Sequence, residues 1–224
     1  VSFVDAYGVR RLAGQEWLVT CALTSSHIPD VEEELVCEVD VTTLTNRQFC
    51  VVQDPVDTSF APQRGKQEVR TNTSFFLHPG ESLLGGVQRV HVLAEEEALL
   101  LTASEAFTDE EGKLVPAGSR WMLHGPCDYI PPIQVEIVEK RRVIPLDKNE
   151  GIYVRDNKSG AVRSVIGESY MLKPSEVLWE KCMPPVVDEL LSRKGTDLTR
   201  VITYAVPHNS ACQIYNYKTR VARV

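Results

Sequence analysis

The sequence lacks the cysteine and histidine spacings that hold metals or redox centres. Its six cysteines form no CxxC pair and its five histidines are scattered singly, so we expect no zinc site. Glycine-rich phosphate loops of the GxGxxG and GxxxxGK[ST] types are also missing. Separately placed, reduced thiols are typical of an intracellular protein.

Long hydrophobic runs and clustered basic residues are lacking too. No apolar run reaches the roughly 18 residues that suggest a membrane span. The formal net charge is -7, and only Lys140-Arg141-Arg142 is locally basic, so we expect neither a nucleic-acid site nor a membrane surface in this segment. No nucleophile elbow is present. We therefore expect no enzyme activity, no cofactor, and no catalytic, cofactor-binding or metal-binding residue.

One segment has an alternation of oxygen ligands before a glycine, as in a calcium loop: Asp147-Lys148-Asn149-Glu150-Gly151. An EF-hand requires glycine at the sixth position and a bidentate carboxylate at the twelfth. This chain has Ile152 and Lys158 at those positions. We expect no calcium site there.

What the sequence does have is an internal repeat. The pattern Phe3-x-Asp5 followed by Ala13-Gly14-x-x-Trp17 recurs about 100 residues later as Phe107-x-Asp109 and Ala117-Gly118-x-x-Trp121. Half of that period is also visible, because the runs that begin at Phe49, Ala98 and Gly151 occupy matching positions. The unit is therefore about 50 residues long, too small to be stable without its neighbours.

The repeat predicts the domain organisation. We expect the end of a first repeat at residues 1–43, repeat units at 44–92, 93–145 and 146–205, and the start of a further repeat at 206–224. Both ends fall inside a repeat, so we expect a piece of a longer array. A short helix is predicted at 184–194, between Pro184-Pro185 and Gly195.

Short β-rich segments separated by turn residues dominate the chain. Strands are predicted at, among others, residues 17–19, 49–52, 135–138 and 152–154, and Asn157–Gly160 is predicted to be a hairpin turn. Residues 57–72 are predicted to be an exposed loop. The fold class is mainly β: a tandem array of small antiparallel β-sheet units stacked into an elongated rod. Cys50, which matches Ile152, should be a small buried hydrophobic residue.

Aromatic residues at recurring positions are predicted to anchor the small cores. Trp17 and Trp121 share one repeat position, and a ligand-stacking function is the alternative for this pair. The predicted structural core anchors are Trp17, Trp121, Tyr153, Tyr170 and Trp179. We expect Trp121→Ala to lower the free energy of unfolding by about 3 to 5 kcal/mol.

Six segments resemble the major vault protein family: Gly14–Val19, Ser74–Glu81, Ile144–Val154, Val165–Leu172, Glu176–Lys181 and Tyr204–Asn209. The resemblance covers all 224 residues. It implies a structural repeat segment in the wall of the vault, a hollow ribonucleoprotein particle in which many identical chains associate laterally. It also implies a scaffold for signalling or transport cargo.

The resemblance implies partners as well. These are the chain itself, as a large homo-oligomer, with a poly(ADP-ribose) polymerase, a telomerase-associated protein and vault RNA. The implied location is cytoplasmic with a smaller nuclear fraction. The competing interpretation is an adaptor that captures partner peptides on exposed strand edges. Such an adaptor should contain a unit that departs from the repeat, and only residues 57–72 and 184–195 depart.

Overall fold

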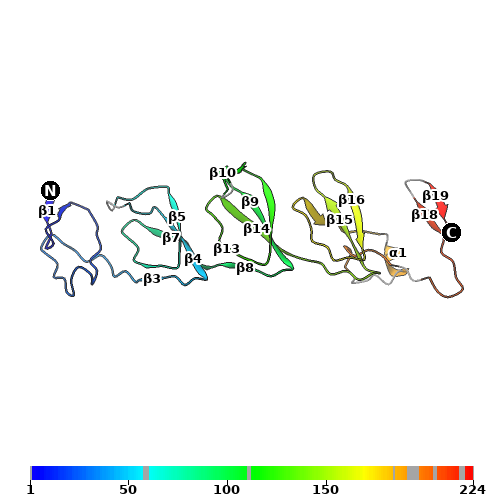
Figure 1. Cartoon of the computed structure of the whole chain (residues 1–224), viewed down its shortest axis with the longest axis horizontal. Coiled ribbons are helices and arrows are strands. Elements are labelled where there is room, and N and C mark those ends of the chain that lie inside the picture. The colour runs from blue at the N-terminus through cyan, green and yellow to red at the C-terminus, as the bar shows by residue number, and fades with distance from the viewer. Residues whose placement is uncertain are drawn as a thin grey trace. The chain divides into compact units, whose positions relative to one another are not determined.

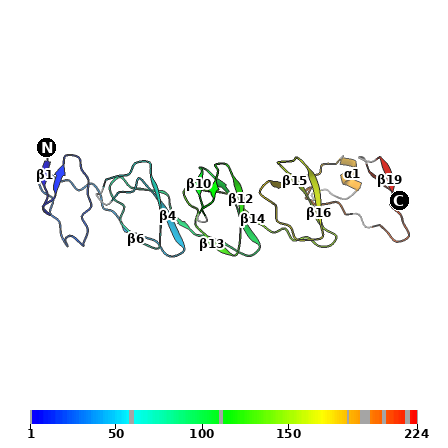
Figure 2. The ribbon, with the colours of Figure 1, turned by 45° about the horizontal axis from the view of Figure 1, so that its top comes forward.

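The computed structural model describes residues 2–57, 61–109, 112–183, 185–190, 197–203, 206–216 and 220–223. It divides into two compact units, residues 1–93, 102–119 and 126–136, and residues 94–101, 120–125 and 137–224. Regular structure is almost entirely β-strand, in small sheets of two or three strands, so the predicted fold class is confirmed (Figures 1 and 2). The stacking of these units into a rod stays a prediction.

The first strands along the chain are β1 (Ser2–Val4) and β2 (Arg10–Leu12). Next come β3 (Thr42–Thr43), β4 (Gln48–Gln53), β5 (Gln67–Thr71), β6 (Ser74–Phe75) and β7 (Ser82–Arg89). They are followed by β8 (His91–Leu93), β9 (Glu97–Ala103), β10 (Phe107–Thr108), β11 (Leu114–Val115), β12 (Arg120–His124), β13 (Cys127–Tyr129) and β14 (Val135–Arg142). The last elements are β15 (Gly151–Asp156), β16 (Val162–Ile166), β17 (Glu176–Leu178), α1 (Pro185–Leu190), β18 (Ile214–Asn216) and β19 (Val221–Arg223).

Each repeat unit contains a three-stranded sheet whose central strand carries the apolar run. The orders are β5-β4-β7, β12-β9-β14 and β16-β15-β17. The central strands have neighbours on both edges, and their side chains are buried on both faces, which explains why consecutive residues are apolar. The most buried large side chains are Phe49, Cys50, Val52, Leu99, Leu101, Ile152 and Val154. The prediction for Cys50 is confirmed, since it is 0% exposed.

A second, smaller pairing closes each unit. β3 pairs with β6, β8 pairs with β13, and a single bridge joins Ile144 to Tyr170. Two clusters show how the parts pack: Leu44, Cys50 and Val52 form one, and Leu146, Ile152, Val154 and Val165 form another. These residues lie at matching repeat positions, so the cores recur as the strands do.

The hairpins β1–β2 and β10–β11 carry the longer period. Both are antiparallel, and Gly8 and Gly112 both adopt a positive φ in their turns, at 79° and 78°. In both, the aspartate after the first strand donates its backbone N–H to a carbonyl four residues later, Asp5 to Val9 and Asp109 to Lys113. The shared pattern of Phe, Asp and Gly therefore specifies one local structure twice.

Two other sequence predictions have clear outcomes. The Asn157–Gly160 turn joins the antiparallel strands β15 and β16, so the predicted hairpin is confirmed. The prediction that residues 57–72 form an exposed loop is wrong for Gln67–Thr71, which form β5 and pair with β4. In β5 the polar residues Glu68 and Arg70 alternate with Val69, a pattern that suits a strand with one covered face. The neighbouring turn residues obscured this pattern in the sequence.

The third strand of the sheet is interrupted in the fourth repeat. β4 pairs with all of β7 around a bulge, where Gly85 and Gly86 have positive φ. β15 pairs with β17 only over residues 154–156. Its first half bonds instead to residues 199–201, through Tyr153 N to Thr199 O and Val201 N to Gly151 O, both 2.8 Å. Residues 179–198 are thus an insertion between β17 and residues 199–201, at the position where β7 has its bulge in the second repeat.

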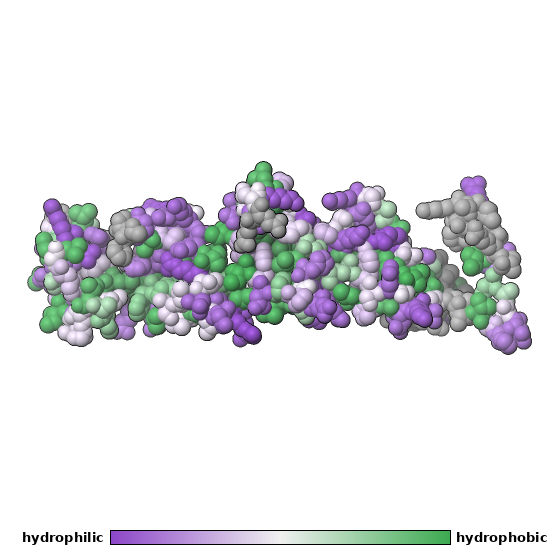
Figure 3. All heavy atoms as spheres, in the orientation of Figure 1, coloured by the Kyte–Doolittle hydropathy of each residue, from purple (hydrophilic) through white to green (hydrophobic). Residues whose placement is uncertain are grey.

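Helix α1 lies in this insertion and within the helix predicted at 184–194. Residue 184 and residues 191–194 of that prediction lie outside the described residues. No helix in the described part of the chain is long and apolar enough to span a membrane. On the face drawn in Figure 3, hydrophobic and hydrophilic residues are interspersed, as expected for sheets with one solvated face.

The strand predicted at residues 17–19 is absent: Trp17, Leu18 and Val19 belong to no strand. β-rich residues form a stable strand only when a neighbour satisfies their backbone groups. The corresponding residues near Trp121 form β12 beside β9. Residues 17–19 have no such neighbour in the described chain.

Candidate functional site

A buried glutamate precedes the third strand in two of the repeats. Glu81 stands before β7 and Glu176 begins β17, and both are almost completely buried. Each accepts a hydrogen bond from the backbone N–H three residues earlier, His78 N at 2.9 Å and Lys173 N at 3.1 Å. The glutamate N–H bonds back to the same residue's carbonyl. The carboxylate therefore closes the turn that leads into the strand.

An arginine from the strand beside the central strand holds the other oxygen of each glutamate. Arg70 of β5 donates from Nη2 to Oε1 of Glu81 at 3.1 Å, and Arg163 of β16 donates to Oε1 of Glu176 at 2.8 Å. Each guanidinium also lies over an aromatic ring, Phe75 at 4.7 Å and Tyr170 at 5.2 Å from the ring centroid. We call these two groups the arginine–glutamate clusters.

In both clusters the pKa of the buried glutamate is lowered. Burial alone would raise the pKa of Glu176, but hydrogen bonds from Tyr170 and Arg163 outweigh it and hold the pKa below its usual value. Burial likewise acts to raise the pKa of Glu81, and the backbone donors His78 and Val56 together with Arg70 lower it overall. Both glutamates are therefore ionised in the folded protein at neutral pH, as a paired buried charge must be.

The first repeat has the same glutamate with a different partner. Glu33 Oε2 accepts the backbone N–H of Asp30 at 3.1 Å, as in the arginine–glutamate clusters, and lies 3.0 Å from Nε2 of His27. Nδ1 of His27 lies 2.9 Å from the hydroxyl of Tyr7, whose ring stacks on the imidazole. Oε1 of Glu33 is buried and has no hydrogen-bond partner among the described residues.

This Tyr7–His27–Glu33 chain has the connectivity of a proton relay. However, His27 and Glu33 are six residues apart, as are Phe75 and Glu81 and also Tyr170 and Glu176. The matching pairs contain no histidine. The relay position is therefore better explained as a turn-closing position of the repeat than as a catalytic site.

The third repeat has no charged residue at the position of the buried glutamate. Six residues after Tyr129 stands Val135, which is 7% exposed, in place of a glutamate. Tyr129 is half-buried, and burial together with the negative charge of Asp109 raises its pKa to about 12. The repeat therefore tolerates either an ion pair or an apolar residue at this point, as expected when a buried pair is replaced as a whole.

The five predicted core anchors are each half-buried and none is fully buried. Trp17 lies under the guanidinium of Arg11 at 4.6 Å and beside Phe3. Tyr153 meets Trp179 edge-on, with ring centroids 5.9 Å apart, and Tyr170 belongs to an arginine–glutamate cluster. The structure thus brings Tyr153 and Trp179 together and leaves the others apart, and their function as anchors stays a prediction.

Sequence reasoning missed the residues of the arginine–glutamate clusters. A signal was present, because His78-Pro79-Gly80-Glu81 and Lys173-Pro174-Ser175-Glu176 share a proline and a glutamate at the same spacing. The partner arginines lie five and seven residues before the ring that they cover, a variable spacing that a fixed-offset comparison does not detect. Only the strand register brings them to the carboxylates.

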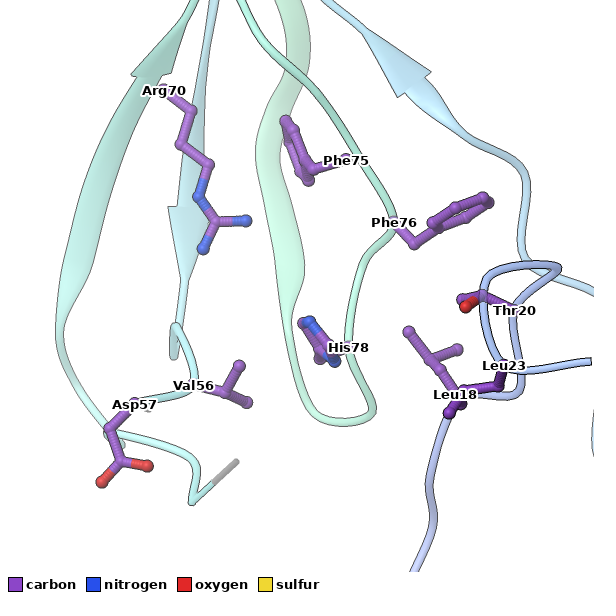
Figure 4. Close-up of a pocket in the computed structure, with 9 residues that line it drawn as sticks. All are labelled: Leu18, Thr20, Leu23, Val56, Asp57, Arg70, Phe75, Phe76 and His78. Atoms are coloured by element: carbon purple, nitrogen blue, oxygen red, sulfur yellow. The ribbon is translucent and has the colours of Figure 1, made fainter. Parts of the chain in front are cut away.

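A pocket of about 530 Å³ lies beside the first of these clusters (Figure 4). Its lining residues are Leu18, Thr20, Leu23, Val56, Asp57, Arg70, Phe75, Phe76 and His78. The walls are mainly apolar, and the polar groups are those of Thr20, Asp57, Arg70 and His78. The pocket therefore suits an apolar side chain of a peptide rather than a charged cofactor. Among the described residues no group of His, Cys, Asp and Glu could hold a metal ion.

Comparison with known proteins gives concordant results. Three models of the Major Vault Protein repeat domain match residues 41–87, 91–132 and 143–199. Major vault protein alpha of Dictyostelium discoideum is 54% identical over 226 residues, covering 96% of this chain. The major vault proteins of Strongylocentrotus purpuratus and Bos taurus are 48% and 47% identical, and both alignments cover 100% of it. The chain spans only 27% to 28% of the length of these relatives.

Proposed function

Because the chain belongs to the major vault protein family, we propose that it is a structural segment in the wall of a vault particle. Its function would be the lateral association of many identical chains. Small repeated sheets suit this use, since each adds one modest contact and the contacts sum along the array. Closure into a ring requires a head-to-tail contact between two different faces of the chain.

The observation that carries the proposal is the recurrence of exposed apolar residues on the flanking strands. They are Leu84 and Val87 on β7, Val138 on β14, Val162 and Ile166 on β16, and Val177 and Leu178 on β17. Single exposed apolar residues are normal on a protein surface. Their presence in each of the three repeat units, on strands at the edges of sheets, supports a surface that another chain covers.

Electron microscopy of the full-length protein, expressed and purified without partners, tests the proposal. We expect hollow barrel-shaped particles from the native chain. A double variant, Val162→Lys with Ile166→Lys, should yield only small oligomers, because two charges would be placed in the contact. Lys158→Ala, in the neighbouring turn, is the matched control and should assemble normally. Intact barrels from a chain without residues 44–200, or from the double variant, would contradict the proposal.

The further partners implied by the resemblance, a poly(ADP-ribose) polymerase, a telomerase-associated protein and vault RNA, belong to the same proposal. So do a scaffold for signalling or transport cargo and a cytoplasmic location with a smaller nuclear fraction. No described residue is assigned to any of these partners. We also expect no catalysis by this segment.

The pocket beside Phe75 favours a second candidate, an adaptor that binds peptides. An apolar peptide side chain could enter between Leu18 and Phe76, and the exposed edge of β5 could pair with the peptide backbone. The two candidates differ in the state of the isolated full-length chain. Monomers or small oligomers that bind peptides would favour the adaptor over the wall.

A further inference from the structure

A buried arginine near the end of β14 is bonded to the backbone of the fourth repeat. Arg141 is only 8% exposed, and a buried guanidinium requires acceptors for its N–H groups. Its Nη1 donates to the carbonyls of Leu172 at 3.1 Å and Lys173 at 2.6 Å. Its Nε donates at 3.1 Å to Glu139, whose side chain is 56% exposed. Two of these three hydrogen bonds therefore depend on a neighbouring repeat.

The peptide bond between Leu172 and Lys173 is held at both ends by charged side chains. Its carbonyl accepts from Arg141, and its N–H donates to Oε2 of Glu176 at 3.1 Å. The other oxygen of Glu176 accepts from Arg163 at 2.8 Å. Hydrogen bonds in series polarise one another, so each bond in this row is stronger when the others are present. The peptide group thus connects Arg141 to Glu176, although neither ion pair of these two residues joins them directly.

In the second repeat the position of Arg141 is occupied by Gln88. Val90 and Val143, two residues further along, donate their N–H groups at 3.0 and 2.9 Å to matching carbonyls just before β4 and β9, which fixes this alignment. No side-chain hydrogen bond joins Gln88 to the described part of the chain. The corresponding bond from the second repeat to the third is therefore missing among these residues.

We propose that Arg141 couples the end of β14 to the arginine–glutamate cluster of the fourth repeat, so that the two open as one cooperative unit. Loss of Arg141 leaves two carbonyls without a charged donor and weakens the bond from Lys173 to Glu176. Loss of the Glu176 charge weakens the bond to Arg141 in turn. The division into compact units agrees, since residues 137–142 belong with the fourth repeat and residues 126–136 do not. The coupling stands whether or not chains associate laterally.

Amide hydrogen exchange of the 224-residue chain in low urea tests the proposal. Arg141→Met should speed exchange at the amides of Lys173 and Glu176 about tenfold or more, because a hydrogen bond from a charged donor is lost and the turn opens more often. Arg141→Lys keeps the charge without the two-carbonyl geometry, so the increase should be smaller. Arg142→Met is the matched control: it removes the same charge from a side chain that is 77% exposed, and both amides should exchange as in the native chain.

The reciprocal variant separates coupling from a local packing contribution. Glu176→Gln should speed exchange in residues 137–142 of β14, which a purely local change at the fourth repeat would not do. Glu81→Gln makes the same change in the second repeat, where the arginine is absent, and should leave β14 unchanged. In the double variant Arg141→Met with Glu176→Gln, exchange at Lys173 should rise about fivefold less than the product of the two single effects, as expected within one network.

Three results would overturn the proposal. One is unchanged exchange at Lys173 and Glu176 in Arg141→Met or, where that variant does not fold, in Arg141→Lys. Another is an equal effect of Arg142→Met, which would indicate a general effect of net charge. The third is a double variant whose effect equals the product of the single effects while β14 does not respond to Glu176→Gln. Circular dichroism of each variant establishes that it is folded before exchange is measured.

Discussion

The hydroxyl of Tyr170 donates a 2.6 Å hydrogen bond to Oε2 of Glu176, the buried carboxylate at the start of β17. Phe75 is the corresponding ring of the second repeat and has no hydroxyl, yet Glu81 there is equally buried. In both clusters the buried carboxylate closes the turn before the third strand, but the hydrogen-bond donors to the carboxylate differ between the two.

The hydroxyl of Tyr170 should make a measurable but modest contribution to stability. Tyr170→Phe should lower the free energy of unfolding by about 1.5 kcal/mol, the low end for a hydrogen bond to a charged group, because Arg163 and Lys173 still bind the carboxylate. Urea denaturation followed by circular dichroism measures the change. Tyr153→Phe is the control and should be nearly neutral, since its hydroxyl makes no hydrogen bond among the described residues. Equal effects of the two substitutions would contradict this assignment.

Arg70 and Glu81, the charged partners of the first arginine–glutamate cluster, should depend on each other for their contribution to the free energy of unfolding. Arg70→Leu should destabilise by about 3 kcal/mol, because it leaves the fully buried Glu81 without its counter-ion. The double variant Arg70→Leu with Glu81→Val imitates the third repeat, where Val135 stands alone. Its loss should be smaller than the sum of the two single losses. Strict additivity in this double-mutant cycle would show that the pair is not coupled.

Acid should destabilise the unit that contains Glu97. Hydrogen bonds from Lys140 and the backbone of Ala94 lower the pKa of Glu97 to about 2, from an ordinary value of 4.5. A pKa that is lower in the folded state contributes stability that is fully present above about 4.5 and is lost as the pH falls from there through about 2. The pKa of Glu176 is shifted in the same direction, so it adds to the loss over the acidic range.

Thermal unfolding measured at pH values from about 7 down to about 2 tests this expectation. Glu97→Gln should reduce the fall in the unfolding midpoint below about pH 4.5, because that carboxylate no longer titrates. Glu95→Gln, at an exposed neighbouring carboxylate, should follow the native curve. If the unfolding midpoint of Glu97→Gln falls with pH as steeply as that of the native protein over the whole range, the acid destabilisation is not due to Glu97.

Gly151 is required by close packing, not by its backbone conformation. A Cβ at this position would lie 2.7 Å from the carbonyl oxygen of Val165 and 2.9 Å from Cγ2 of Val201. Gly151→Ala should destabilise by about 1 to 3 kcal/mol, as overpacking does. It should also speed amide exchange at residues 199–201, which pair with this part of β15. Ser164→Ala, on the adjacent strand β16, is the control and should change neither quantity appreciably.

The internal repeat determined much of the fold. Matching runs at Phe49, Ala98 and Gly151 identified the central strands, because a strand covered on both edges and both faces must be continuously apolar. The Asn157–Gly160 hairpin followed from local turn chemistry, and the burial of Cys50 from its match to Ile152. These features depend on residues close in sequence or on a fixed offset, which the sequence displays directly.

Features that depend on contacts between distant strands were decided by the tertiary structure. The register of β5 and β16 brings Arg70 and Arg163 to the buried glutamates, at sequence separations that differ between repeats. The continuation of β15 pairing by residues 199–201, across an insertion, has no local signal. Trp17-Leu18-Val19 has the composition of a strand and forms none, because pairing needs a neighbour that the described chain does not place there. Composition therefore fixes which residues can form a strand, and only the three-dimensional arrangement supplies the partner that makes it one.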